Sequence, residues 1–375
     1  MTASELDVLA PDPAERRLLE GSEAIAEAMV AAGCRFFAGY PMTPFTEVLE
    51  HMARLLPTVG GTCINAESEL EAVGMAWGAA ATGCRSATGS VGQGLSLMQE
   101  SLSELCYARV PLVVLNMARG QGDYFQATRG GGHGDYRHIV LSPSDIPEAI
   151  ELVQLAFHLA DHWRNPVLFL GDYYLAHVLQ GVAVTPIDFG PTPPKDWALR
   201  GRTGGTGHAL AVTFAAGKDH IADSGGGYGA HLERMAAHIN AMAEEVTPMA
   251  ETAFLEDAEL VVVSYGTAAR YMRHVVGELR AEGLPVGFVR PITLWPFPTE
   301  VVAAAAEGAR AVAVYELNNG QMVDDVRLAV LGRAPVHFIG RVSTDDYGFG
   351  IAPDLDVEFL AQRVRATLAD VRRQQ

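Results

Sequence analysis

The chain has 375 residues, of which 49% are hydrophobic and 19% charged, so it is long and apolar enough for two domains with large cores. Its 27 basic and 45 acidic side chains give a formal net charge of −18, which disfavours binding to nucleic acid or to an anionic membrane surface. The acidic start lacks the apolar core of a signal peptide, and no apolar run approaches the roughly 18 residues of a transmembrane helix. We therefore expect a cytoplasmic protein without nucleic-acid or membrane partners.

The first half of the chain alternates between helix and strand patterns. Helices are predicted over residues 22–32, 46–56, 67–81, 95–107 and 146–160, and strands over 35–38, 62–65, 85–89, 111–117, 139–141 and 166–170. Ser22 is the expected N-cap of the first helix, and Thr43 with Pro44 the expected start of the second. Alternation of this kind predicts an α/β layer with a parallel sheet.

The second half begins with an irregular stretch rich in glycine and proline, residues 186–250, which is typical of a linker with one helix over 231–245. A second and smaller alternation follows. Its strands are predicted over 260–264, 286–290, 311–315 and 336–339, and its helices over 267–281, 298–307, 322–331 and 356–372. This pattern predicts a separate βα domain.

The four cysteines, at positions 34, 63, 84 and 106, are widely spaced and form no CxxC pair. Such spacing argues against a disulfide framework and against a zinc or iron–sulfur site held by this chain alone. Buried thiols in a reducing compartment are the simpler interpretation, and no metal site is predicted on this chain.

Two turns that precede helices carry candidate site residues. Thr43 follows a strand, where ligands of parallel sheets bind, so its hydroxyl can face an anion or can merely cap a helix. Glu67, Glu69 and Glu71 suit the first turn of a helix because of the helix dipole. Glu69 is the one expected to point inward, and a buried carboxylate needs a partner such as a proton-sharing heterocycle.

Three further segments follow strands. Residues 88–94, TGSVGQG, do not match the GxGxxG dinucleotide fingerprint, and the sequence contains no GxxxxGK[ST] phosphate loop. Arg119 can clamp a carboxylate or can form a surface ion pair. Residues 122–136 interleave glycine, aromatic and charged side chains, and His133 among them is either an acid/base group or a hydrogen-bonded loop histidine.

Three of these segments resemble the alpha-type subunit of 2-oxoacid:ferredoxin oxidoreductases. Residues 31–53, AAGCRFFAGYPMTPFTEVLEHMA, are similar to the family's GYPITPSTE segment, and residues 66–83, AESELEAVGMAWGAAATG, to its EDEIASIGMAIGAS helix. Residues 122–137, GDYFQATRGGGHGDYR, are most similar to subunits of the branched-chain (2-oxoisovalerate) type, with the 2-oxoglutarate type close behind. The resemblance covers most of residues 18–340.

The resemblance implies a fold and an activity. The fold is α/β, with a thiamine diphosphate-binding pyrimidine-type domain over residues 18–185, a linker region over 186–250 and a transketolase C-terminal-like βα domain over 251–375. The activity is thiamine diphosphate-dependent oxidative decarboxylation of a 2-oxoacid to acyl-CoA and CO₂, with electrons passed to iron–sulfur clusters on partner chains.

The resemblance also assigns residues. Glu69 matches the glutamate that activates the cofactor by bonding its aminopyrimidine ring, Thr43 the threonine near the substrate carboxylate and oxo group, and Arg119 the arginine that contacts the carboxylate. These three are the predicted catalytic residues. The other predicted site residues are Tyr40, Pro41, Gly92 and Gln93 around the cofactor and Asp123, Tyr124 and His133 in a substrate loop.

In the family the cofactor lies between two subunits, and a beta-type chain holds the diphosphate through Mg²⁺ with a GDG…N motif. This chain has no GDG motif, so we expect half of an active site. The implied partners are a beta-type thiamine diphosphate and iron–sulfur subunit in an (αβ)₂ core, gamma-type and ferredoxin-like subunits, ferredoxin and coenzyme A. Mg²⁺ and the iron–sulfur cluster are expected on partner chains.

Two departures from the family pattern leave the substrate open. The loop between Arg119 and Asp123 is shorter than usual, and GSVGQG replaces the usual SGPG turn. A bulkier or aromatic 2-oxoacid would fit a site with a shortened loop. The alternatives to a catalytic subunit are a structural or regulatory subunit that keeps the fold, and a self-sufficient transketolase-like enzyme, which the missing diphosphate motif disfavours.

Overall fold

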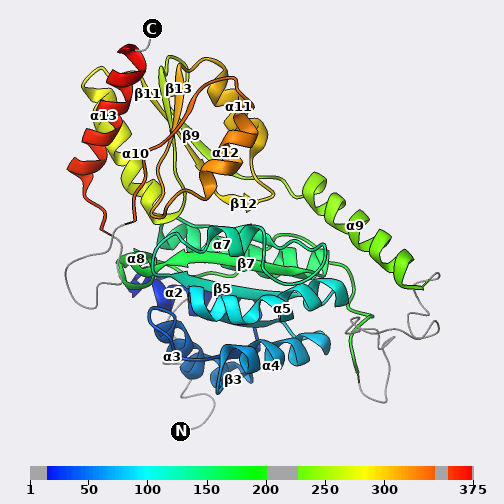
Figure 1. Ribbon diagram of the computed structural model, residues 1–375. Helices are drawn as coiled ribbons and strands as arrows, with labels where there is room; N and C mark the ends of the chain where they lie inside the picture. The colour runs from blue at the N-terminus through cyan, green and yellow to red at the C-terminus, as the bar shows by residue number, and fades with distance from the viewer. Residues whose placement is uncertain (1–14, 201–226, 343–353, 374–375) are drawn as a thin grey trace.

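A computed structural model describes residues 15–200, 227–342 and 354–373 of the chain. Two β-sheets, each covered by helices on both faces, lie one above the other (Figure 1). We call the seven-stranded sheet with its helices the first domain and the five-stranded sheet with its helices the second domain.

The first domain contains the predicted parallel sheet. Its strand order is β12-β6-β7-β5-β4-β2-β3, and every pair is parallel except β12 with β6. The strands are β2 (Phe36–Gly39), β3 (Thr62–Asn65), β4 (Ser86–Ser90), β5 (Leu112–Ala118), β6 (Ile139–Leu141), β7 (Pro166–Asp172) and β12 (Thr293–Trp295). The central strands β5 and β7 are buried along their whole length, as their continuous apolar runs predict.

Alternate side chains of β5 belong to two separate cores. Val113 and Leu115 pack with helices α2, α3 and α7, whereas Leu112 and Val114 pack with α4 and α5 on the other face. The helices of this domain are α2 (Gly21–Ala31), α3 (Thr46–Leu55), α4 (Glu69–Ala81), α5 (Gly92–Ala108), α7 (Ile146–Trp163), the short α6 (Tyr124–Thr128) and α8 (Tyr173–His177), and the 3₁₀ turn η1 (Leu56–Val59). A small antiparallel pair, β1 (Arg17–Glu20) with β8 (Leu179–Val182), lies beside them.

The second domain has the predicted βα alternation. Its strand order is β14-β13-β10-β11-β9, parallel except for β9. The strands are β9 (Ala250–Ala253), β10 (Leu260–Val263), β11 (Val286–Pro291), β13 (Ala311–Val314) and β14 (Val336–Phe338). Helices α10 (Gly266–Ala281) and α13 (Val357–Arg373) cover one face of the sheet, and α11 (Thr299–Glu307) and α12 (Met322–Val330) the other.

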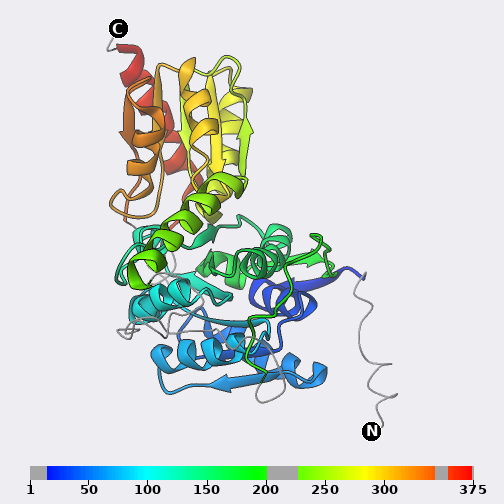
Figure 2. The same cartoon turned by 90° about the vertical axis from the view of Figure 1, so that its right-hand side faces the viewer.

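One long helix of the linker region, α9 (Gly227–Glu245), runs along the side of the molecule near the boundary between the domains (Figure 2). Met242 joins the core beneath α7, and the His238 ring lies 5.8 Å from that of Trp163. None of the helices in the described ranges is long and apolar enough to cross a membrane.

Two predicted helix caps are wrong. Ser22 lies inside α2 and donates a hydrogen bond of 3.0 Å to the Ala176 carbonyl, because the helix already begins at Gly21, where a Cβ would lie 1.6 Å from the Leu175 carbonyl oxygen. Helix α3 begins at Thr46, preceded by a cis peptide bond between Thr43 and Pro44. The chain makes a separate turn before α3, closed by hydrogen bonds from the N–H groups of residues 45 and 46 to the Met42 carbonyl.

Candidate active site

The predicted site residues gather where neighbouring parallel strands end. Strands β2, β4 and β5 are adjacent and parallel, so the residues that follow them meet at one edge of the sheet. A cavity of about 360 Å³ lies there. It is lined by Gly92, Gln93, Ser96, Arg119, Gly120, Gly122, Asp123 and Gln126. Four of the predicted site residues, Gly92, Gln93, Arg119 and Asp123, therefore share one cavity.

Of the three carboxylates at the start of α4, Glu69 alone is buried, as predicted. Its side chain is 2% exposed, and Oε1 accepts a hydrogen bond of 2.7 Å from the Ser90 hydroxyl at the end of β4. Ser68 caps the helix by accepting from the Glu71 N–H, so residues 68 and 71 stay at the surface while Glu69 turns inward. The local sequence thus aims one carboxylate at the sheet edge.

Two glycines bring the start of α5 close to these polar groups. A Cβ on Gly94 would lie 2.1 Å from the Ser90 hydroxyl oxygen and 2.4 Å from Glu69 Oε1, so a side chain has no room there. A Cβ on Gly92 would lie 2.3 Å from an oxygen of Asp123. The N-terminal end of α5 therefore lies close to two carboxylates, those of Glu69 and Asp123.

The Arg119 side chain is held at the cavity by a hydrogen bond to the backbone of another segment. Its Nε donates a hydrogen bond of 3.0 Å to the Thr43 carbonyl, which joins the end of β5 to the turn after β2. Within the described ranges, Arg119 forms no ion pair with a carboxylate. Among the described residues the guanidinium is therefore not committed to a carboxylate of this chain, and it can bind an anionic ligand.

The Asp123 side chain holds the loop that follows Arg119 in place by two hydrogen bonds. One carboxylate oxygen accepts 2.9 Å from Asn116 Nδ2, and the other accepts 2.9 Å from Gln126 Nε2. The same Gln126 amide donates 3.1 Å to the Gly92 carbonyl and so links the loop to the start of α5. Asn116, Gln126 and Ser90 were not predicted, although Asn116 is the one polar side chain in the apolar run 111–117.

Two predicted loop residues lie away from the cavity. Tyr124 is buried, and its hydroxyl donates 2.6 Å to Asp325 of α12 in the second domain. Burial and the charge of Asp325 raise the pKa of this phenol well above its ordinary value. His133 Nε2 lies 2.5 Å from Glu104 Oε1, and its ring stacks on Tyr107 with centroids 5.6 Å apart. Of the remaining candidates, Tyr40 and Pro41 are exposed beside the Thr43 turn.

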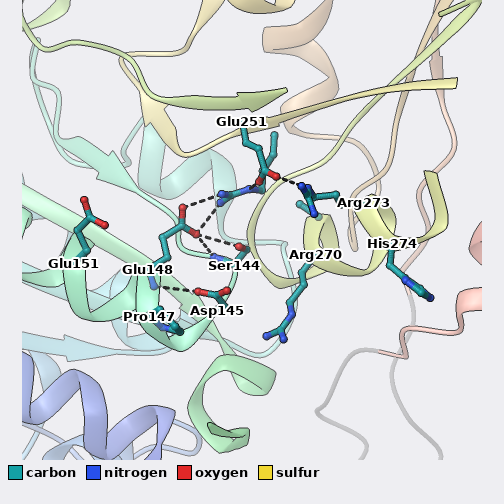
Figure 3. A pocket seen from close by; sticks show the side chains of 11 residues that line it. Ser144, Asp145, Pro147, Glu148, Glu151, Glu251, Arg270, Arg273 and His274 are labelled. Carbon is teal, nitrogen blue, oxygen red and sulfur yellow. Dashed lines mark hydrogen bonds and ion pairs between the residues drawn. The ribbon is translucent and has the colours of Figure 1, made fainter. Parts of the chain in front are cut away.

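A second cavity, of about 600 Å³, lies between the two domains and is lined by charged side chains (Figure 3). Arg290 donates 2.8 Å bonds to both oxygens of Glu148 and to Glu251, which also pairs with Arg273. Burial opposes the charge of Arg290, but the two carboxylates outweigh burial and hold the pKa of the guanidinium above its ordinary value. The arginines and glutamates pair with one another, and these ion pairs join α7 of the first domain to β9, β11 and α10 of the second.

Comparison with known proteins decides the family. Residues 27–199 match the family model described as pyruvate flavodoxin/ferredoxin oxidoreductase, thiamine diphosphate-binding, and residues 258–349 match pyruvate:ferredoxin oxidoreductase core domain II. The ketoisovalerate oxidoreductase subunit VorB of Methanothermobacter thermautotrophicus is 36% identical over 336 residues, which are 87% of this chain and 93% of that subunit. The chain belongs to the 2-oxoacid:ferredoxin oxidoreductase family. It is an alpha-type subunit, and the resemblance seen in its sequence is confirmed.

Further relatives agree with this family. The 2-oxoglutarate synthase subunit KorA of the same species is 35% identical over 356 residues, which are 88% of this chain and 94% of that subunit. The solved structure of 2-oxoglutarate:ferredoxin oxidoreductase from Magnetococcus marinus, with 2-oxoglutarate, coenzyme A and succinyl-CoA bound, superposes with a TM-score of 0.75 at 25% identity. The match covers 96% of this chain and 66% of that one.

The predicted fold class is also confirmed. A split-gene transketolase, solved as an inactive beta4 tetramer, superposes with a TM-score of 0.57 at 14% identity, over 94% of this chain and 98% of that one. The alpha-type subunit thus combines a thiamine diphosphate-binding domain with a transketolase-like second domain. As a member of this family it is a subunit of an oxidoreductase that decarboxylates a 2-oxoacid.

Proposed function

We propose that the alpha-type subunit contributes the aminopyrimidine-binding half of a thiamine diphosphate site, with Glu69 as the group that bonds the ring. The observation that carries the proposal is the buried carboxylate of Glu69, held on one oxygen by Ser90 at the edge where β2, β4 and β5 end. A buried carboxylate needs a polar partner, and a ring nitrogen that shares its proton supplies one.

The residues around Glu69 fit such a cofactor. When bound, thiamine diphosphate acts as an electron sink for the carbanion left by decarboxylation. Glu69 would hold the proton shared with the ring, and the exposed turn at Tyr40 and Pro41 and the start of α5 at Gly92 and Gln93 would border the cofactor. Gly94 has room for no side chain, which keeps the helix start close to the carboxylate.

Arg119 and Thr43 would bind the substrate. Arg119 lines the cavity and forms no ion pair within the described ranges, so its guanidinium suits the carboxylate of a 2-oxoacid. Its bond to the Thr43 carbonyl supports a position of the threonine near the same substrate carboxylate. Asp123 would act indirectly, by fixing the loop through Asn116 and Gln126.

The cavity favours a substrate with a single carboxylate. Arg119 is the sole cation among the described lining residues, and a dicarboxylate such as 2-oxoglutarate calls for a second one. We propose a branched-chain 2-oxoacid, the substrate class in the name of the VorB relative, with an aromatic 2-oxoacid as the alternative. Activity of the reconstituted enzyme on 2-oxoisovalerate, 2-oxoglutarate, pyruvate and phenylglyoxylate tests this order, and a preference for 2-oxoglutarate would contradict it.

An exposed apolar face next to Glu69 supports a partner at this edge. Leu70 is 51% and Met75 40% exposed on α4, and Leu97 is 56% exposed on α5. Gly74 and Gly78, on the same side of α4, have open space where a side chain would lie. We call the four residues of α4 among them, Leu70, Gly74, Met75 and Gly78, the α4 face; exposed apolar side chains of this kind favour docking of another subunit.

The proposed occupant of the α4 face is a beta-type chain that carries Mg²⁺, the diphosphate contacts and an iron–sulfur cluster, in an (αβ)₂ core. Gamma-type and ferredoxin-like chains, ferredoxin and coenzyme A complete the proposed system. The four cysteines are free thiols, which supports a cytoplasmic location.

Substitution of Glu69 tests the proposal. Glu71, two positions later in the same helix and exposed, is the matched control. Glu69→Gln keeps the shape and a hydrogen bond but cannot share a proton, so turnover of the reconstituted complex should fall by about 100-fold or more. Glu71→Gln should leave turnover unchanged. Normal turnover of Glu69→Gln would favour a structural or regulatory subunit.

A further inference from the structure

The ligand-binding edge of the second domain is occupied by a residue of the first. The connection from β10 leads to its neighbour β11, and the connection from β11 returns past β10 to β13 on the other side, so the chain reverses direction across the sheet at β10 and β13. In parallel sheets a ligand crevice opens at the carboxyl ends of the strands at such a point. Here Gln121, from the loop after β5 of the first domain, lies there and is 5% exposed.

Every polar group of Gln121 is bonded to the second domain. Its side-chain amide donates 2.8 Å to the Tyr265 carbonyl, just after β10, and accepts 2.8 Å from the Leu317 N–H, just after β13. Its backbone N–H donates 3.2 Å to the Leu317 carbonyl. Its backbone carbonyl accepts from Asn318 Nδ2 at 2.8 Å and from the Tyr265 hydroxyl at 3.2 Å. Gln121 therefore occupies the position at the strand ends where a parallel sheet of this kind would bind a ligand.

The residues of the second domain that bind Gln121 are themselves held by a buried carboxylate, Glu316. Glu316 is fully buried and accepts hydrogen bonds from three backbone N–H groups at the start of α12 and from Asn318 Nδ2. Burial raises the pKa of Glu316, and these donors partly offset the effect. Gln321, from the same turn, also donates 2.8 Å to the Gly122 carbonyl. The turn before α12 is therefore held in place by its own hydrogen bonds, and it binds residues 121 and 122 through Asn318 and Gln321.

Gln121 lies between the two residues that shape the cavity. Arg119 is two positions before it and bonds the Thr43 carbonyl, and Asp123 is two positions after it and bonds Asn116 and Gln126. The described lining of that cavity contains no residue of the second domain. The second domain therefore acts on the cavity through bonds to the chain that lines it, and residues 119–123, with Gln121 at their centre, are the part of that chain that carries Arg119 and Asp123.

We propose that Gln121 is a positioning residue through which the second domain fixes Arg119 and Asp123, and so sets the affinity for the 2-oxoacid. This inference rests on the proposed role of Arg119. Release of Gln121 leaves buried donors and acceptors at Tyr265 and Leu317 without partners, so the segment moves and the guanidinium loses its alignment with the substrate carboxylate.

The test uses Gln121→Met in the full chain, assembled with its beta-type partner. Methionine keeps the volume and removes both side-chain bonds. The KM for the 2-oxoacid should rise about 10-fold while kcat stays within about 3-fold. Hydrogen exchange of the amides in residues 119–123 should accelerate about 10-fold. Asn318→Ala removes one bond to the Gln121 carbonyl together with one to Glu316. It should shift both quantities in the same direction, and it covers the case of a Gln121 variant that does not fold.

Glu148→Gln is the matched control, because it weakens an interdomain contact to Arg290 that touches none of these residues. It should leave KM and the exchange of residues 119–123 unchanged. Unchanged exchange or KM in Gln121→Met, or the same changes in Glu148→Gln, would overturn the inference. Failure of the proposed function is distinguishable, since the wild-type complex would then oxidise none of the 2-oxoacids while exchange still reports on Gln121.

Discussion

The Ser90 hydroxyl at the end of β4 donates a hydrogen bond of 2.7 Å to Glu69 Oε1 at the start of α4, and both side chains are buried. A buried carboxylate that loses a donor loses about 1–3 kcal/mol of stabilisation and can turn to another orientation. The bond therefore links the geometry of the sheet edge to the direction in which the carboxylate points.

Ser90→Ala should lower kcat of the reconstituted complex by about 10-fold and destabilise the chain by about 1–3 kcal/mol. Steady-state kinetics and urea unfolding measure the two effects. Ser86→Ala is a control on the same strand, because Ser86 is also buried but donates to the Cys84 carbonyl instead. It should change stability without lowering kcat, and equal kcat losses in both variants would refute a specific role for Ser90.

Gly94→Ala should disrupt the site, because its Cβ would lie within 2.4 Å of both Ser90 and Glu69 oxygens. We expect a loss of about 1–3 kcal/mol in the free energy of unfolding, together with loss of activity. Gly78→Ala, in the open interior of α4, should instead stabilise the isolated chain by about 0.5–1 kcal/mol. Urea unfolding of both variants checks the prediction, which fails if they shift stability in the same direction.

The α4 face should bind the partner chain. Met75→Asp places a charge on this face and should raise the Kd for the beta-type chain at least about 10-fold, since a desolvated charge opposes burial. The free energy of unfolding of the isolated chain should change by less than about 0.5 kcal/mol. Leu328→Asp, on the exposed side of α12, is the control and should leave Kd unchanged. Assembly measured by analytical ultracentrifugation or calorimetry distinguishes the two.

Stability should fall on mild acidification because of His138. This imidazole is 1% exposed, and burial lowers its pKa from 6.5 to about 4, so the folded chain keeps it neutral while the unfolded chain takes up a proton. The unfolded state binds more protons between these two values, and stability is lost as the pH falls from 6.5 towards 4.

Between pH 7 and pH 5 the contribution of His138 is about 2 kcal/mol. His138→Gln, which cannot take up a proton, should therefore lose about 2 kcal/mol less than the wild type over this range in urea unfolding. An identical pH dependence in the two proteins would assign the effect to other groups.

The parts of the fold that depend on local sequence were predictable. The continuous apolar runs predict β5 and β7, and Glu69 is the buried carboxylate of its helix start as expected, although the helix begins at residue 69 and not at 67. The parts that depend on distant chain were not. Tyr124 has the local features of a substrate-loop residue, but its hydroxyl partner lies 201 positions away. The same holds for Gln121, whose partners at Tyr265 and Leu317 leave no local pattern in the sequence.

Strand β12 comes from the second half of the chain yet extends the sheet of the first domain by pairing antiparallel with β6. A truncation in the region 186–250 would remove this strand and leave β6 as an uncovered edge, open to pairing with other chains. The two halves are therefore not independent building blocks. Any scheme for expressing the first domain by itself has to supply a substitute for residues 293–295, or accept a product that aggregates.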